Sequence, residues 1–211
     1  MDYRITEVYK FFLVLERYAF GDLQLLHKLT KKAEAKDVEN EEENSNMPPT
    51  TMYPHGFEFN FGKSVHCRAT IPFALMIFSC MDIIGFLVRK TPADNAHKET
   101  EKNIENFYEH ISSTPTEDEL KCLIRLFRHG LAHNYFPKLG QSISYHSTNP
   151  NTLFFSDNSG ICLNVNLLEK HLKEGFYKIR SDERLYLQME TNLTDLNTYY
   201  LTHEKCKLLS P

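Results

Sequence analysis

The chain has 211 residues, of which 41% are hydrophobic and 25% are charged, and its net charge is −4 at pH 7. This length and composition suit one globular domain with its own hydrophobic core, so we expect a single domain over residues 1–211. Affinity for a phosphate backbone comes mainly from Lys and Arg. The negative charge therefore argues against a protein that coats nucleic acid without specificity.

The cysteines are odd in number and widely separated, with no CxxC pair and no signal-peptide pattern before Tyr3. This usage is typical of reduced thiols, so we expect a cytoplasmic protein without a zinc knuckle. The five positions are Cys67, Cys80, Cys122, Cys162 and Cys206.

The N-terminal part of the chain predicts one long helix followed by a loop. Apolar residues recur at steps of three or four between Ile5 and Leu26, which is typical of a helix with one apolar stripe, here over residues 2–34. Residues 36–51 lose this periodicity, accumulate acidic side chains and end in Pro48 and Pro49. We expect a mobile acidic loop there.

The segment Ile71–Val88 is eighteen residues long and carries one charge, Asp82, so it just reaches the length of a membrane span. A carboxylate near the middle of a lone span would cost about 2.5–3.5 kcal/mol. We therefore predict a buried central helix and no membrane association. Thr70 is expected to cap this helix and Pro72 to lie in its first turn. Asp82 then needs a partner, for which Arg128 is the first candidate.

Two further helices are predicted before the most informative segment. Apolar residues between Ile104 and Ile111 indicate a short amphipathic helix near 98–112, which the sequence SSTPT ends. Thr116 and Glu119 then form a capping box, which predicts the start of the next helix.

After Pro137 the pattern changes to short strands at 142–146, 152–155 and 161–165. They predict a β-hairpin or meander inserted at 142–165. Asn166 with Glu169 is expected to cap a short helix that ends at Gly175, and a last helix is expected over 182–207. The expected fold is mainly α, a bundle of four to five helices with this small β insertion.

The segment RHGLAHNYFPK, Arg128–Lys138, crowds an arginine, two histidines and a tyrosine around one helix end. On a regular helix, Arg128 and His133 lie on opposite sides of the apolar stripe that contains Phe127. They can meet only if the helix end unwinds before Pro137, or if a second copy supplies its own pair across a two-fold axis. The second arrangement predicts a homodimer.

The spacing of Arg128, four residues and His133, with the polar His129 directly after the arginine, resembles the signature of HEPN domains. The resemblance implies a helical bundle that dimerises with its active site between the protomers, and it implies metal-independent endoribonuclease activity without a cofactor. A histidine can take the proton from a 2′-hydroxyl, and a guanidinium matches the charge on phosphate oxygens. His133 is accordingly the candidate base and Arg128 the candidate stabiliser of that charge.

His129 would orient the phosphate or serve as the acid for the leaving group, and the expected product is a 2′,3′-cyclic phosphate. Together, Arg128, His133 and Tyr135 also resemble the motif of HEPN toxins that are paired with a nucleotidyltransferase antitoxin. The resemblance implies a toxin or defence protein that cuts RNA, in which Tyr135 is the residue that such an antitoxin adenylylates. The alternative is that Tyr135 packs at the helix end and has no such role.

Three alternatives stay open. Arg128 and His133 can cap the free carbonyl groups at a helix end and have no further role. His129 and His133, four residues apart, share a helix face and could hold a metal if Asp82 or His146 joined them. A HEPN-like dimer without activity could serve as a binding module for a nucleotide or a protein.

Overall fold

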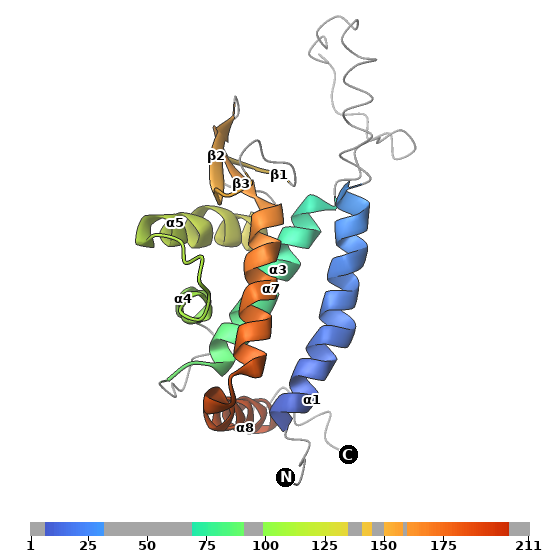
Figure 1. The fold of residues 1–211 in the computed structure, drawn as a ribbon, viewed down its shortest axis with the longest axis vertical. Coiled ribbons are helices and arrows are strands. Elements are labelled where there is room, and N and C mark those ends of the chain that lie inside the picture. Colours follow the sequence, from blue (N-terminus) through green and yellow to red (C-terminus); the bar gives the residue numbers. More distant parts are fainter. Residues whose placement is uncertain are drawn as a thin grey trace, which may run out of the picture.

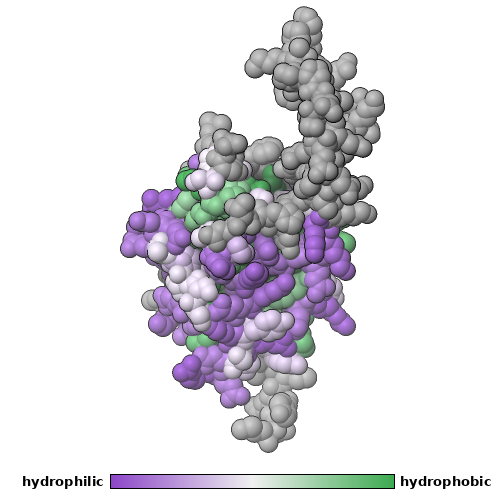
Figure 2. All heavy atoms as spheres, turned by 45° about the horizontal axis from the view of Figure 1, so that its top comes forward, coloured by the Kyte–Doolittle hydropathy of each residue, from purple (hydrophilic) through white to green (hydrophobic). Residues whose placement is uncertain are grey.

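The computed structural model describes residues 7–31, 69–90, 99–134, 141–144, 150–157 and 160–202. Helices make up 77% of these described residues and the remainder includes a small three-stranded sheet, so the prediction of a mainly α fold is confirmed. Long helices lie side by side, with shorter elements packed against one edge and one end of the bundle (Figure 1). The face shown in Figure 2 is mainly hydrophilic, as expected for a bundle with an apolar core. The predicted acidic loop at 36–51 lies outside the described residues.

The first helix is continuous over residues 7–31, within the predicted 2–34. It begins as α1, Glu7–Val14, widens to a π-helical segment at Leu15–Ala19, and continues as helix over residues 20–31. Its inward side chains Val8, Phe12 and Leu23 are buried. Phe12 packs edge-to-face on Phe176, which attaches this helix to α7 (Val165–Ser181).

The central helix is α3, Thr70–Leu87, and it packs against α4, α7 and α8. By length and composition it is apolar enough to cross a membrane, and 61% of its eighteen residues are buried inside the protein. The prediction of a buried central helix is confirmed, and Pro72 lies in its first turn. The predicted cap is wrong. The N-cap position is Ala69, and Thr70 is the first helical residue, buried at 3% exposure.

α4, Thr100–Tyr108, is shorter than predicted and lies very close to α3. The close approach requires Gly85, because a Cβ atom there would lie 1.7 Å from the carbonyl oxygen of Asn103. No other residue type fits between these two backbones.

The next helix runs over residues 117–134, and we call it the motif helix. It consists of α5 (Glu117–Cys122), a π-helical segment (Leu123–Arg128) and α6 (His129–Asn134). The predicted capping box is confirmed. The amide of Glu119 donates to the Thr116 hydroxyl at 3.3 Å, and the amide of Thr116 donates to the Glu119 carboxylate at 2.8 Å.

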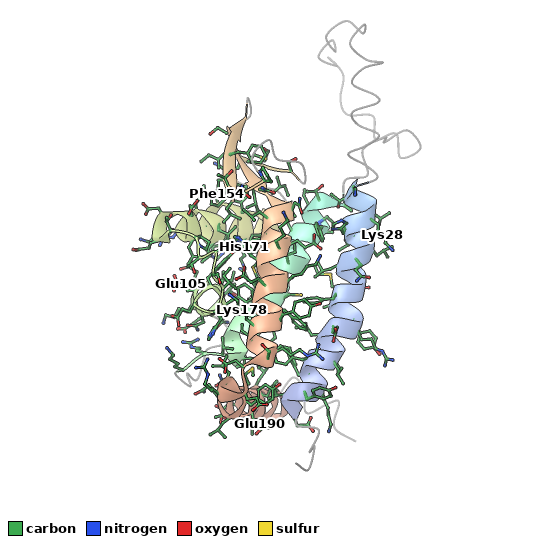
Figure 3. All side chains as sticks on the ribbon, viewed as in Figure 1. Lys28, Glu105, Phe154, His171, Lys178 and Glu190 are labelled. Atoms are coloured by element: carbon green, nitrogen blue, oxygen red, sulfur yellow. The ribbon has the colours of Figure 1, made fainter. Side chains whose placement is uncertain are left out.

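The sheet has the strand order β1-β3-β2, formed by Gln141–Ser144, Gly160–Asn164 and Phe154–Asp157. β2 and β3 form the predicted antiparallel hairpin. A meander is wrong, because β1 runs parallel to β3. Phe154 of β2 stacks on Phe127 with ring centroids 5.6 Å apart, so the sheet covers one side of the motif helix (Figure 3).

α7 begins earlier and ends later than predicted. Asn164 caps it by accepting from the amide of Leu167 at 3.1 Å, because the strand β3 delivers that residue directly to the helix start. Gly175 does not end the helix. It lies inside α7 against Phe107, whose ring would be 2.3 Å from a Cβ atom at this position. The absence of a side chain therefore allows Phe107 to pack against α7.

A 3-10 turn, Glu183–Leu185, leads into the last helix, α8, Tyr186–Thr202. One side chain of α8 closes the end of α3. The amide group of Asn192 donates to the carbonyl oxygens of Phe86, Leu87 and Arg89 at 3.2, 2.7 and 2.9 Å. Asn192 is 3% exposed, so these carbonyl groups are satisfied away from solvent.

Candidate functional site

Four polar side chains converge where α3, α4 and the motif helix meet, and we call them the Asp82 cluster. Asp82 accepts from the Thr100 hydroxyl at 2.9 Å and from the Asn103 amide at 2.8 Å, using a different carboxylate oxygen for each. Nη2 of Arg128 donates to the Thr100 hydroxyl at 3.0 Å and lies 3.8 Å from Asp82 Oδ2. The predicted pairing of Asp82 with Arg128 is therefore confirmed, with Thr100 as an additional link.

The local sequence explains why these groups meet. Asp82 and Gly85 are three residues apart and so share one side of α3. Gly85 admits the backbone of α4 at Asn103, which brings the polar side of α4 against the carboxylate. Thr100 and Asn103 are likewise three residues apart and present both donors to Asp82.

Arg128 is only partly engaged by this cluster. Its Nη2 atom makes the contacts to Thr100 and Asp82, and its Nε and Nη1 groups have no partner among the described residues. The side chain is 22% exposed. A guanidinium held by one nitrogen and open at its other edge is preoriented for an anion.

A second ion pair secures the start of α4 beside the cluster. Arg89, which is 7% exposed, donates to Glu99, the residue before α4. Hydrogen bonds from Arg89, then from Lys102, lower the pKa of Glu99 below its usual range. Glu99 therefore stays ionised and holds Thr100, the next residue, in place.

His129 follows Arg128 and lies on the same side of the motif helix as Arg125. Its Nε2 atom is 3.2 Å from Oε1 of Glu101 on α4. Arg125 is exposed and has no partner among the described residues. The surface around Arg128 thus combines three basic groups with the carboxylates of Asp82 and Glu101.

The structure does not describe every predicted site residue. It places the backbone of His133 in α6, whereas its side chain lies outside the described part of the chain. Tyr135, Pro137 and His146 also lie outside it. The convergence of Arg128 with His133 across a dimer stays a prediction, as does the role of Tyr135.

Thr100 and Asn103 are absent from the sequence-based site. The available signal was their spacing, since a pair of polar residues at i and i+3 on a short helix marks one polar side.

Among the residues that the structure describes, no group of three or more His, Cys, Asp or Glu side chains could hold a metal ion. In comparisons with known proteins, no family model, no curated protein and no solved structure matches the chain.

Proposed function

We propose that the protein is a metal-independent endoribonuclease of the HEPN type, active as a homodimer. The observation that carries this proposal is the placement of Arg128. Its guanidinium is oriented by Thr100 and Asp82 and is partly exposed. Its Nε and Nη1 groups have no partner among the described residues and are free to donate to a phosphate.

The proposed reaction needs a base, an acid and stabilisation of charge. His133 takes the proton from a 2′-hydroxyl, whose oxygen attacks the adjacent phosphorus. The bond from phosphorus to the 5′-oxygen breaks, and His129 protonates that oxygen or orients the phosphate. Arg128 stabilises the charge on the phosphate oxygens, and a fixed donor of this kind contributes roughly 10²–10³-fold to a rate. The products are a 2′,3′-cyclic phosphate and a 5′-hydroxyl.

A dimer would bring together the arginine and the histidine that a single motif helix holds apart. Residues five apart on a regular helix point about 140° apart, so Arg128 and His133 of one chain do not converge on one phosphate. A two-fold axis beside the motif helix would bring Arg128 of one protomer to His133 of its partner. A toxin or defence role follows from the resemblance to HEPN toxins, with Tyr135 as the residue that a nucleotidyltransferase antitoxin would modify.

One observation favours a second function, a binding module without activity. Carboxylates surround the basic groups, with Asp82 3.8 Å from Arg128 and Glu101 3.2 Å from His129. They reduce the attraction of a long polyanion and suit a small nucleotide or a protein partner better.

The test is incubation of the purified protein with RNA in EDTA, comparing wild type with Arg128→Ala and His133→Ala. Both variants are expected to lose activity at least about 100-fold. Arg184→Ala is the matched control, because Arg184 is an exposed arginine in the turn before α8 and is not part of the surface around Arg128, and it is expected to stay within a few-fold of wild type. Analysis of the cleaved ends identifies the cyclic phosphate.

Circular dichroism of each variant establishes that it is folded, since Arg128 also contacts Thr100. Equal cleavage by wild type and both active-site variants would indicate a contaminating nuclease and exclude the proposed enzyme. Absence of cleavage, with nucleotide binding that Arg128→Ala abolishes, would establish the binding module instead.

A further inference from the structure

The first turn of α4 meets the motif helix through two pairs of neighbouring residues. Thr100 accepts from Nη2 of Arg128 at 3.0 Å, and Oε1 of the next residue, Glu101, lies 3.2 Å from Nε2 of His129. Two successive residues of α4 therefore contact two successive residues of the proposed site. The first contact orients a guanidinium. The second acts on an imidazole, whose two nitrogens have distinct roles.

The position of Glu101 is fixed by the residues that precede it. Arg89, which is 7% exposed, donates to Glu99, and the hydroxyl of Thr100 donates to Asp82 at 2.9 Å. Both contacts hold the start of α4 against α3 and the residues that follow α3. Glu101 therefore extends from a backbone that is held in place, although its side chain is 47% exposed.

The contact determines which nitrogen of His129 keeps its proton. An ionised carboxylate accepts hydrogen bonds and donates none, so Nε2 of His129 must carry the hydrogen that it shares with Glu101. The ring then gains and loses its second proton at Nδ1. Without the carboxylate, the neutral ring could hold its proton on either nitrogen.

This assignment fits the role of leaving-group acid in the proposed reaction. When the bond from phosphorus to the 5′-oxygen breaks, the oxygen keeps the electron pair and takes the proton from Nδ1 of the charged ring. The ring becomes neutral with its remaining proton on Nε2, which is the form that Glu101 binds. His133 gains the proton of the 2′-hydroxyl in the same reaction, so one histidine becomes charged as the other becomes neutral.

We propose that Glu101 is a positioning residue for His129, and that Nδ1 of His129 supplies the proton to the leaving 5′-oxygen. This inference rests on the ribonuclease proposed above. Glu101 acts through the histidine and does not itself contact the reacting atoms. The pair is exposed by 47% at Glu101 and 33% at His129, and such pairs contribute little to stability. Substitution of Glu101 should therefore leave the fold intact.

The first test is the protonation of the His129 ring, followed by nitrogen NMR of the full chain across a pH series. His129→Gln identifies the signals of this ring. In wild type, Nε2 should stay protonated while Nδ1 titrates. Glu101→Gln should lose this preference, because an amide can accept through its oxygen or donate through its nitrogen.

Glu105→Gln is the matched control for both tests. Glu105, labelled in Figure 3, is an exposed glutamate one turn further along α4, and its side chain has no partner among the described residues. Its substitution should leave the ring signals of His129 unchanged.

The second test compares two substrates that differ in their need for an acid. The alkoxide that leaves from RNA needs a proton, whereas a 4-nitrophenyl ester of uridine 3′-phosphate releases a stable anion without one. With RNA, Glu101→Gln should lower kcat about 10-fold and leave KM nearly unchanged. With the nitrophenyl ester it should match wild type. Glu105→Gln should match wild type with both substrates.

Each contrary result overturns a stated part of the proposal. Equal RNA cleavage by wild type and Glu101→Gln would exclude the positioning role and leave the proposed enzyme intact. An equal loss with both substrates would exclude Nδ1 of His129 as the acid, because a merely structural defect slows both reactions. Titration of Nε2 in wild type would exclude the fixed tautomer. Absence of RNA cleavage by wild type would instead overturn the enzyme itself, and this role with it.

Discussion

Arg128 and Asp82 are linked through one hydroxyl group. Thr100 accepts a hydrogen bond from Nη2 of Arg128 at 3.0 Å and donates one to Asp82 at 2.9 Å. A carboxylate on the central helix therefore orients the arginine of the motif helix by way of α4. Substitutions in α3 or α4 should therefore change the orientation of Arg128, although the proposed catalytic residues all lie on the motif helix.

Removal of the Asp82 carboxylate should lower stability. Asp82→Ala leaves the hydroxyl of Thr100 and the amide of Asn103 without their acceptor, and we expect a loss of about 1–3 kcal/mol. Asp82→Asn should lose less, because its oxygen still accepts one hydrogen bond. Urea denaturation measures both free energies of unfolding. Asp195→Ala, at an exposed acid of α8, is the control and should change stability little. A loss for Asp82→Ala no larger than that of the control would contradict the relay.

Gly85 and Gly21 should respond oppositely to the same substitution. Gly85→Ala drives a methyl group into the carbonyl oxygen of Asn103, so we expect a loss of about 2–4 kcal/mol and displacement of α4. Gly21→Ala meets open space and should stabilise the helix by about 0.5–1 kcal/mol. Thermal denaturation of both variants at equal protein concentration provides the comparison. Similar melting temperatures for the two variants would show that α3 and α4 are not in close contact.

His171 should make stability depend on pH. It is 5% exposed on α7 and lies 3.4 Å from the Tyr108 hydroxyl, and burial lowers the pKa of His171 below its usual 6.5, although Glu174 and Glu119 act in the opposite direction. The folded protein therefore disfavours the protonated ring. Its stabilising contribution is complete above pH 6.5 and declines as the pH falls from there through the lowered pKa.

We expect His171→Gln to flatten the fall in unfolding free energy between neutral and mildly acidic pH. Urea denaturation at several pH values measures this slope. Burial also lowers the pKa of His110, so His110→Gln should flatten the slope further when the two substitutions are combined. Parallel curves for wild type and His171→Gln would rule out a buried neutral imidazole.

The described cysteines should differ in reactivity. Burial raises the pKa of Cys80 to about 12, and the side chain is 3% exposed, so thiolate is scarce and poorly accessible. Cys122 is partly exposed, although burial and Glu119 raise its pKa as well. Iodoacetamide followed by peptide mass spectrometry should modify Cys122 in the native protein and Cys80 only after denaturation. Rapid native modification of Cys80 would show that α3 is exposed.

Features encoded by neighbouring residues were predictable. The capping box of Thr116 and Glu119 involves residues three apart, and the structure contains both of its hydrogen bonds. Asp82 was identifiable because a single carboxylate in an apolar helix requires a partner, and Arg128 is that partner. The hairpin was indicated by two short strands around a turn that contains Gly160, whose φ is 125°.

Features that depend on tertiary packing were not predictable. Gly175 has the sequence pattern of a helix end, yet it lies inside α7 because Phe107 occupies the space beside it. β1 pairs in parallel with a strand that lies well beyond it in the sequence, which periodicity within β1 cannot indicate. The π-helical segment Leu123–Arg128 widens the motif helix just before the site, whereas a helical wheel assumes an even turn.

Asn192 limits where the chain can be truncated. Its one amide group donates to three carbonyl oxygens at the end of α3, so detachment of α8 would remove this donor from all three. A fragment that stops before Tyr186 would lose this closure and would expose the core side chains that Met189, itself fully buried, packs against. The bundle should therefore melt in one concerted step, and proteases should find no stable intermediate that lacks its last helix.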